Sequence, residues 1–161
     1  MKKSIVFIMS LTFLLAGIQP ACKKSDPTKV AIKSFTVQQI PMVRPDGTSW
    51  EDFPMIEGGP DVYWVLTDEN DSVFYGDRNI RFDRVTKDHL PLVRVVSPPL
   101  VLTSLSRNYY LKIYDWDLIG GDDLMATMGP FSFSKYSKDK PGNMTLSGDS
   151  AIVIMELDWR D

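Results

Sequence analysis

The sequence predicts an all-β fold, an antiparallel eight-stranded β-sandwich. Apolar residues occur in short runs that are rich in β-branched and aromatic side chains, and turn residues interrupt these runs about every eight to twelve positions. None of the runs shows the spacing of an amphipathic helix. A hydrophobic content of 43% and a charged content of 24% are ordinary for one globular domain. The runs that predict strands are 30–40, 61–67, 72–75, 90–96, 100–105, 109–114, 144–146 and 151–157.

The first three strands are predicted by alternation and by turn chemistry. Residues 30–40 alternate between small or polar and apolar side chains, and 61–67 form an apolar run that begins with an acid. The acidic turn 68–71 then allows 72–75 to pair back as a hairpin. We expect the acids of this turn to be solvated.

The middle of the chain is predicted less regularly. Residues 77–88 are polar and indicate either an edge strand or a short helical turn. Residues 90–96 and 100–105 predict two short strands separated by Pro98 and Pro99, because prolines are tolerated at strand edges and turns.

The last strands follow a run that alternates cleanly. Residues 109–114 predict a strand in which every second side chain shares a face, and the chain breaks into acids from Asp115. Phe131 and Phe133 alternate with serines, and 144–146 and 151–157 predict a final hairpin around the turn 147–149.

The beginning of the chain predicts export. Two lysines precede an apolar run, 5–18, that is too short to span a bilayer and is typical of a secretory signal. Cys22 follows, and the arrangement resembles a bacterial lipoprotein signal, in which the cysteine is lipidated and becomes the new N-terminus. Ala21 fits that pattern, whereas Gln19 and Pro20 depart from it. The alternative is an ordinary signal peptide with a free Cys22.

These features divide the chain into a signal peptide (1–21), a lipidated cysteine with its tether (22–29) and a sandwich domain (30–161). We expect the protein to be anchored in the bacterial cell envelope, with the outer membrane as the expected location.

Charge and composition exclude several classes of function. The net charge is −3, and it becomes −5 once Lys2 and Lys3 are removed with the leader. An acidic domain lacks the basic surface that nucleic acid requires. One cysteine allows no internal disulfide, and one histidine, His89, supplies neither a histidine zinc site nor a nucleophile relay. We expect no enzyme activity.

The most informative stretch is D-W-D-L-I-G-G-D-D, residues 115–123. Asp115 and Asp117 project from the same face at the end of a strand. The glycine turn that follows can bring Asp123 back towards them, with Asp122 as a secondary candidate. Clustered carboxylates repel one another unless a cation lies between them, and hard oxygen ligands suit calcium.

This stretch resembles the third calcium-binding loop of C2 domains. That loop carries two aspartates separated by one residue and a third aspartate six residues later, a spacing met by Asp115, Asp117 and Asp123. Ala126 departs from the pattern, since C2 domains usually have glycine there. The resemblance implies a C2-like sandwich that binds calcium.

The resemblance also implies ligands from the first loop. Residues 59–65, G-P-D-V-Y-W-V, look like the junction that ends the first calcium-binding loop, which makes Asp61 a candidate ligand. The loop itself, 41–60, is long enough to suggest a binding role. Asp52 is the better candidate for its remaining ligand and Asp46 the weaker, because P-D-G is also an ordinary turn signal.

The acidic loop allows other interpretations. An EF-hand is excluded because Ile119 and Ala126 stand where it needs oxygen ligands. The acids could instead form a solvated turn and cap backbone amides. Trp116, Leu118 and Ile119 are either loop-tip residues that enter a membrane or packing residues.

The sequence therefore predicts an exported, lipid-anchored, calcium-binding C2-like module that binds phospholipid or another envelope ligand. One alternative is a metal-free interaction module that binds an envelope protein or glycan. A second is an accessory domain of an envelope enzyme.

Overall fold

A computed structural model of the chain, which describes residues 26–50 and 58–161, forms a β-sandwich. All strand pairs are antiparallel, so the predicted antiparallel eight-stranded β-sandwich is confirmed. Its strands are β1 (Lys29–Gln39), β2 (Val62–Asp68), β3 (Val73–Tyr75), β4 (Leu92–Leu102), β5 (Tyr109–Asp115), β6 (Asp123–Phe131), β7 (Asn143–Gly148) and β8 (Ala151–Arg160). Two 3-10 helices, η1 (Lys87–His89) and η2 (Phe133–Tyr136), complete the described elements.

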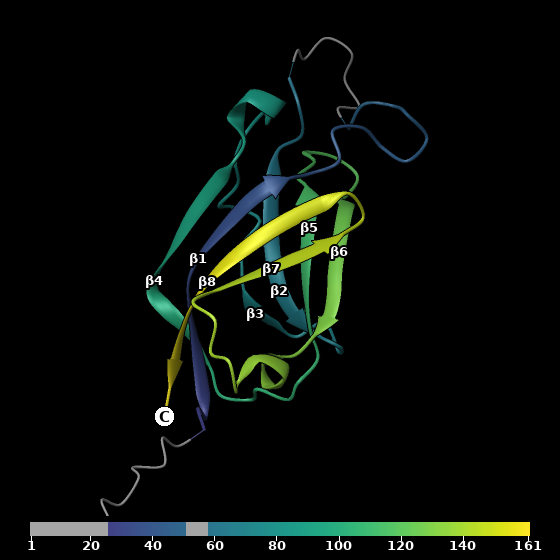
Figure 1. Ribbon diagram of the computed structural model, residues 1–161. Helices are drawn as coiled ribbons and strands as arrows, with labels where there is room; N and C mark the ends of the chain where they lie inside the picture. Colours follow the sequence, from purple (N-terminus) through teal and green to yellow (C-terminus); the bar gives the residue numbers. More distant parts are fainter. Residues whose placement is uncertain (1–25, 51–57) are drawn as a thin grey trace, which may run out of the picture.

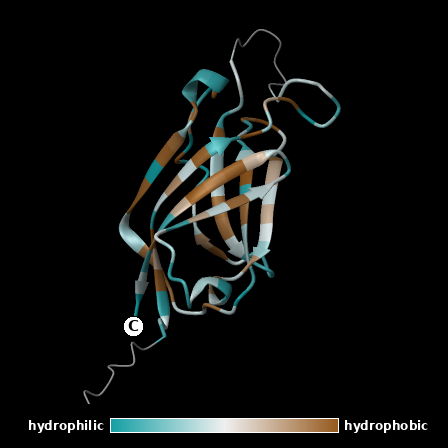
Figure 2. Cartoon of the chain, viewed as in Figure 1, coloured by the Kyte–Doolittle hydropathy of each residue, from teal (hydrophilic) through white to brown (hydrophobic). Residues whose placement is uncertain are grey.

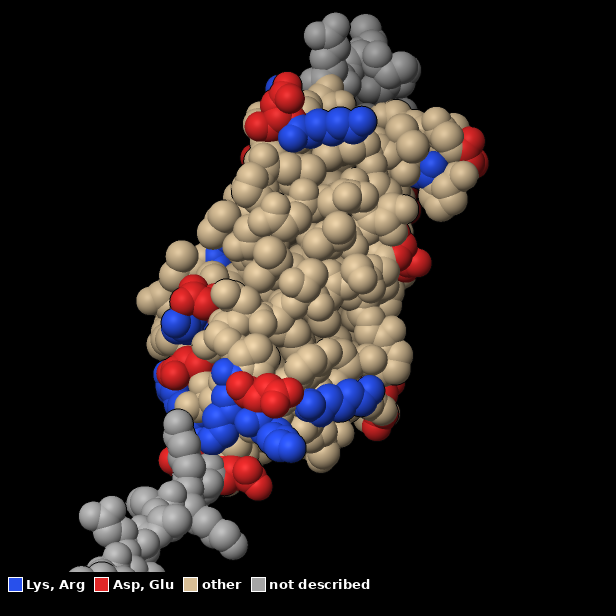
Figure 3. Space-filling view, viewed as in Figure 1, with Lys and Arg blue, Asp and Glu red and all other residues tan. Residues whose placement is uncertain are grey.

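The eight strands divide into two sheets that pack face to face (Figure 1). One sheet has the order β4-β1-β8-β7 and the other the order β3-β2-β5-β6. The first sheet lies in front in Figure 1, and its outer face carries few charges between its two ends (Figure 3). Along this face the strand register aligns Thr36, Ile154 and Thr145.

The core lies between the sheets, and the alternation along each strand fills it. Buried and half-buried residues alternate along β5, and they alternate in the same way over most of β8. In Figure 2, brown and paler positions are interleaved along several strands, whereas much of β8 is continuously brown. Trp64 of β2 is fully buried and lies 6.3 Å from the ring of Phe35 across the sandwich. Each such side chain contributes about 1.5–3 kcal/mol when buried.

One prediction about the middle of the chain was wrong. Residues 92–102 form a single strand, β4, where two strands were predicted. Pairing with β1 is nevertheless interrupted at the prolines, because Ile32 pairs with Leu100 whereas Ser34 pairs with Val95. The residues 96–99 bulge out of an edge strand, where the missing N–H groups of two prolines cost no ladder bond.

Two short 3-10 helices lie in segments for which the sequence predicted no definite strand. Most of 77–88 forms turns, in which Phe82 makes an isolated antiparallel bridge with Val62, and η1 begins only at Lys87. His89 in η1 is exposed. The alternation around Phe131 and Phe133 does not continue a strand, because β6 ends at Phe131 and η2 begins at Phe133. Phe133 is fully buried against the ring of Tyr109 at 5.5 Å.

Three long connections meet at one end of the sandwich, which we call the loop end: 40–61, of which 40–50 and 58–61 are described, 76–91 and 116–122 (Figure 1). The opposite end, which we call the turn end, holds the connections 69–72, 103–108 and 132–142. The described chain enters and leaves at the turn end (Figure 1). In the described ranges, no helix is long and apolar enough to cross a membrane.

Candidate functional site

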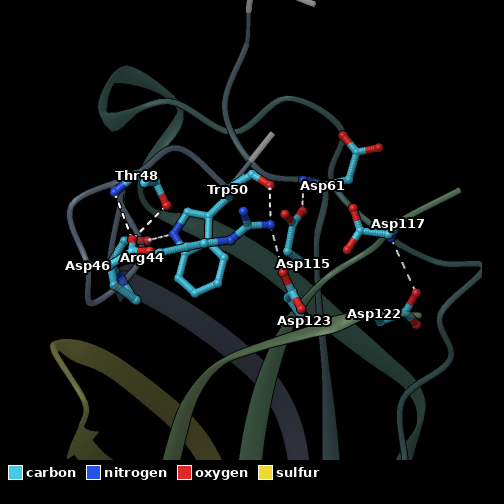
Figure 4. A network of polar contacts seen from close by, with 10 residues as sticks. Arg44, Asp46, Thr48, Trp50, Asp61, Asp115, Asp117, Asp122 and Asp123 are labelled. Atoms are coloured by element: carbon cyan, nitrogen blue, oxygen red, sulfur yellow. Dashed lines mark hydrogen bonds and ion pairs between the residues drawn. The ribbon is translucent and has the colours of Figure 1, made fainter. Parts of the chain in front are cut away.

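The loop end is organised around Asp115, the last residue of β5. Its side chain is almost fully buried, with a relative exposure of 2%. The register places Val62 opposite Asp115, so the start of β2 lies beside the end of β5. The Asp61 N–H donates to Asp115 Oδ1 at 2.7 Å, and the Trp116 N–H donates to the Asp61 carbonyl at 2.8 Å (Figure 4). Asp115 therefore caps a backbone amide, one of the alternatives considered for this loop.

The carboxylate of Asp61 is held by the connection 76–91. The Arg84 N–H donates to Asp61 Oδ1 at 2.8 Å, and Arg81 Nε lies 3.5 Å from Asp61 Oδ2. The same Arg81 nitrogen lies 2.9 Å from Asp83. Its guanidinium group stacks 3.8 Å from the centre of the Trp116 ring, a cation–π contact.

A second aspartate of this loop, Asp122, has three donors. The Tyr63 hydroxyl donates to Asp122 Oδ2 at 2.7 Å, and Arg78 donates to Oδ1 at 2.9 Å. The Asp117 N–H donates to the same Oδ1 at 3.3 Å. Burial of Tyr63 and its bond to the Asp122 carboxylate raise the pKa of the phenol well above its ordinary value. Asp122 is thus a structural acceptor that ties β2 to the loop.

Asp123 is engaged from the first loop. Arg44 donates to Asp123 Oδ2 at 2.7 Å and to the Trp50 carbonyl at 3.0 Å (Figure 4). The guanidinium group also lies 5.6 Å from the centre of the Trp50 ring. Trp50 itself is buried, so Arg44 links a fixed part of the first loop to the start of β6.

The remaining candidate residues are separate from this arrangement or outside it. Asp46 accepts bonds from the hydroxyl and the N–H of Thr48, at 2.6 and 2.9 Å, and these bonds lower the pKa of Asp46. It is the turn acid that P-D-G indicates. Asp52, the preferred first-loop ligand, and Cys22 lie outside the described residues.

As arranged here, the described carboxylates do not fit a calcium cage. Calcium takes six to eight oxygen ligands, and bound carboxylates must turn their oxygens towards it. The carboxylates of Asp61, Asp115 and Asp123 instead accept from arginines or backbone amides. Within residues 26–50 and 58–161, no three His, Cys, Asp or Glu side chains are placed to hold a metal ion. Calcium at Asp52, Asp61, Asp115, Asp117 and Asp123 stays a prediction.

The tip of the loop 116–122 is apolar and exposed. Leu118 and Ile119 have relative exposures of 77% and 72%, and Ile80 of the neighbouring connection has 56%. Gly120 and Gly121 follow with φ values of +103° and +125°, which allow the chain to reverse there. Trp116, by contrast, is half-buried. The three residues considered for the loop tip thus divide into one that packs and two that project.

The sequence interpretation missed the basic residues of the site. Arg44, Arg78 and Arg81 each pair with an aspartate of the loop end, and none was a candidate. A signal was present, since D-R-N-I-R-F-D-R at 77–84 alternates acids and bases near an acidic loop. Such alternation indicates charge pairing.

Comparison with known proteins identifies the fold. No family model and no curated protein matches the chain. The two C2 domains of extended synaptotagmin 2 match with a TM-score of 0.50 and 12% identity over 98% of this chain and 48% of that one. The chain therefore spans about half the length of the solved structure. At this identity the likeness shows the fold alone, and the C2-like sandwich is confirmed.

Two further likenesses are weaker. Human GIVD cytosolic phospholipase A2 matches at 16% identity and a TM-score of 0.45, over 84% of this chain and 17% of that one. A calcium-bound structure of the extended synaptotagmin 2 domains matches at 12% identity and a TM-score of 0.40, over 83% of this chain and 46% of that one. Scores of this size support no further conclusion.

Proposed function

We propose that this protein is an exported, lipid-anchored, non-enzymatic C2-like module that binds a phospholipid surface with its loop end. The observation that carries the proposal is the apolar tip formed by Leu118 and Ile119, whose side chains are 77% and 72% exposed. Large aliphatic side chains that are about three-quarters exposed on a loop favour an apolar environment. Burying each in the interfacial region of a bilayer contributes up to about 1.5–3 kcal/mol.

The loop that carries the tip is held in place, which lowers the cost of ordering it on binding. Asp122 anchors its end through Tyr63 and Arg78, and Trp116 anchors its start beneath the Arg81 guanidinium group. The tip is therefore presented on a fixed base. This supports insertion of a preformed tip.

The charge of the loop end favours neutral headgroups. Its described segments, 41–50, 58–61, 76–91 and 115–123, carry nine aspartates against four arginines and one lysine. Such a surface repels anionic lipid. The lipid class that fits is a zwitterionic one, such as phosphatidylethanolamine or phosphatidylcholine.

The anchor in this proposal lies at the other end of the domain. Cys22 is four residues before Asp26, a separation that the chain spans with at most about 14 Å. Strand β1, with 11 residues, extends about 35 Å from that end towards the loops. In this proposal the lipid anchor holds the turn end close to its membrane. The loop end then points away from that membrane, towards an opposing surface in the cell envelope.

The test is sedimentation of the purified protein with phosphatidylcholine vesicles, in calcium and in EGTA. We expect binding that Leu118→Ser with Ile119→Ser reduces at least tenfold. Val95→Ser is the matched control, because Val95 is 72% exposed on β4 and lies outside the loop end. A protein that stays in the supernatant, or a double variant that binds as well as the wild type, contradicts the proposal. The C2 resemblance implies that the protein binds the vesicles in calcium and not in EGTA.

A second candidate function is a metal-free interaction module for an envelope protein. The observation that favours it is the row of exposed valines on β4, an edge strand: Val93, Val95 and Val101 have relative exposures of 53%, 72% and 41%. The register pairs Val93 with Thr36, which lies on the outer face of the sheet. Here Val95→Lys is expected to abolish capture of an envelope protein, whereas the double loop-tip variant leaves it intact.

A further inference from the structure

We infer that the guanidinium groups of Arg44, Arg78 and Arg81 take the place at the loop end that the C2 resemblance gives to calcium. In this protein the acidic loops are neutralised and joined to one another by arginine, without a metal. The inference concerns how the loop end is held together and is independent of what the loop tip binds.

The first ground is that each arginine pairs with an acidic residue of the loop end. Arg44 lies 2.7 Å from Asp123, and Arg78 lies 2.9 Å from Asp122. Arg81 is at 3.5 Å from Asp61. An arginine favours the ionised form of a carboxylate as calcium does. Arg44 and Arg78 also donate hydrogen bonds to their carboxylates, whereas Arg81 makes ion pairs alone and lies nearer to Asp83, at 2.9 Å.

The second ground is that the pairs connect segments distant in sequence. Arg44 and Asp123 are 79 residues apart, and Arg78 and Asp122 are 44 apart. The three arginines come from two connections, 40–61 and 76–91, and pairs from both reach the acidic stretch at the ends of β5 and β6. A metal ion shared between loops would make the same connections.

The third ground is that the arginines are supported by contacts that a mobile surface side chain would lack. Arg81 stacks on the Trp116 ring at 3.8 Å, and Arg44 also donates to the Trp50 carbonyl at 3.0 Å. The side chains of Arg44 and Arg81 are only 22% and 26% exposed. Planar guanidinium groups suit such combined stacking and pairing.

Calcium would have to displace these donors to enter. The Asp115 carboxylate accepts the Asp61 N–H at 2.7 Å, and Asp61 accepts the Arg84 N–H at 2.8 Å, both from the backbone. These two bonds join Asp61 to the end of β5 and to the connection 76–91, and each occupies one carboxylate oxygen. The second oxygen of Asp61 and an oxygen of Asp123 are taken by Arg81 and Arg44, so calcium can reach them only when the arginines are removed. The structure therefore assigns the neutralising role to arginine, and the loop end needs no calcium to form.

The experiment is thermal unfolding of the purified protein in 10 mM calcium and in EGTA. We expect the wild-type midpoint to be the same in both. A variant with Arg44→Gln, Arg78→Gln and Arg81→Gln is expected to unfold at a lower temperature in EGTA. In 10 mM calcium the unfolding midpoint of this variant should rise by about 3–6 °C. This is the shift expected for a site that binds calcium with a dissociation constant of about 1 mM. The single variant Arg81→Gln gives the same comparison should the triple variant not fold.

Arg107→Gln is the control, because Arg107 pairs with Asp68 at 3.0 Å at the turn end. It should be destabilised and gain no response to calcium. A calcium-dependent rise in the wild type, removed by Asp123→Asn, overturns the inference. An arginine variant that is as stable as the wild type, or that calcium does not restore, overturns it as well.

Discussion

The two ends of the sandwich both bury an aspartate, but they use it differently. Asp68 at the turn end and Asp115 at the loop end have relative exposures of 5% and 2%. Asp68 accepts from the Asn70 and Ser72 amides, two and four residues further on, whereas Asp115 accepts from the amide of Asp61, 54 residues away. The first closes a turn. The second joins two strands and fixes the end of a loop.

This difference shows what a buried acid contributes to each end. A local acceptor stabilises a hairpin whose donors would otherwise face water, since Asn70 and Ser72 are exposed. A long-range acceptor holds a backbone amide that lies between packed strands. The loop end therefore depends on side chains for its shape, while the turn end depends mainly on its backbone.

The sharpest test of the comparison is to remove each carboxylate. Asp115→Ala leaves the Asp61 N–H without its acceptor in a buried position, and we expect a loss of about 2–3 kcal/mol in the free energy of unfolding. Asp68→Ala should cost clearly less, because the amides that lose their acceptor belong to the exposed residues Asn70 and Ser72 and can bond to water. Urea unfolding measures both. Equal losses would remove the distinction between the two ends.

A second test addresses the hydroxyl that ties β2 to the loop. Tyr63→Phe removes the donor at 2.7 Å from Asp122, whose side chain is only 11% exposed, and we expect a loss of about 1–2 kcal/mol. Tyr114→Phe is the control, since its ring stacks on Tyr63 at 5.3 Å and is retained. Urea unfolding measures the stability of both variants. If Tyr63→Phe is neutral, Asp122 does not depend on β2 for its position.

The two ends also differ in how far the sequence could predict them, because the contacts of the turn end are mostly local and those of the loop end are long-range. The turn 68–71 was predicted with its hairpin because its signals are local. The expectation that its acids are solvated was wrong for Asp68, which is buried beside Arg107 at 3.0 Å. Nothing in the turn itself indicates this partner, which comes 39 residues later.

At the loop end, sequence could predict the acids and not their partners. Spacing placed Asp115 at the end of a strand and Asp61 at the start of another, and the register confirms that the two strand ends adjoin. Which cation neutralises the cluster depends on the course of the connections 40–61 and 76–91. These have no periodicity, so the positions of Arg44 and Arg81 follow from tertiary packing alone.

A smaller effect is expected from a single ion pair. Arg44→Gln should lower the free energy of unfolding by about 0.5–1 kcal/mol, and 1 M salt should reduce the difference, because the Asp123 side chain is 45% exposed. Arg160→Gln at the turn end is the control. Its pair with Asp158 has both side chains more than 40% exposed, and we expect almost no loss. Unfolding in low and high salt compares them, and equal losses would show that Arg44 adds nothing beyond a surface pair.

The smallest effect is a pH dependence confined to acid. Burial acts to raise the pKa of Asp68, but the bonds from Asn70 and Ser72 outweigh it and hold the pKa below the ordinary 3.8. A carboxyl with a lowered pKa in the folded state stabilises the protein above its unfolded value, and this contribution is lost as the pH falls through the folded value. The difference in midpoint between the wild type and Asp68→Asn should therefore be constant from pH 7 to pH 5 and shrink below about pH 4. A difference that stays constant down to pH 2 would show that the charge of Asp68 contributes nothing to the turn end.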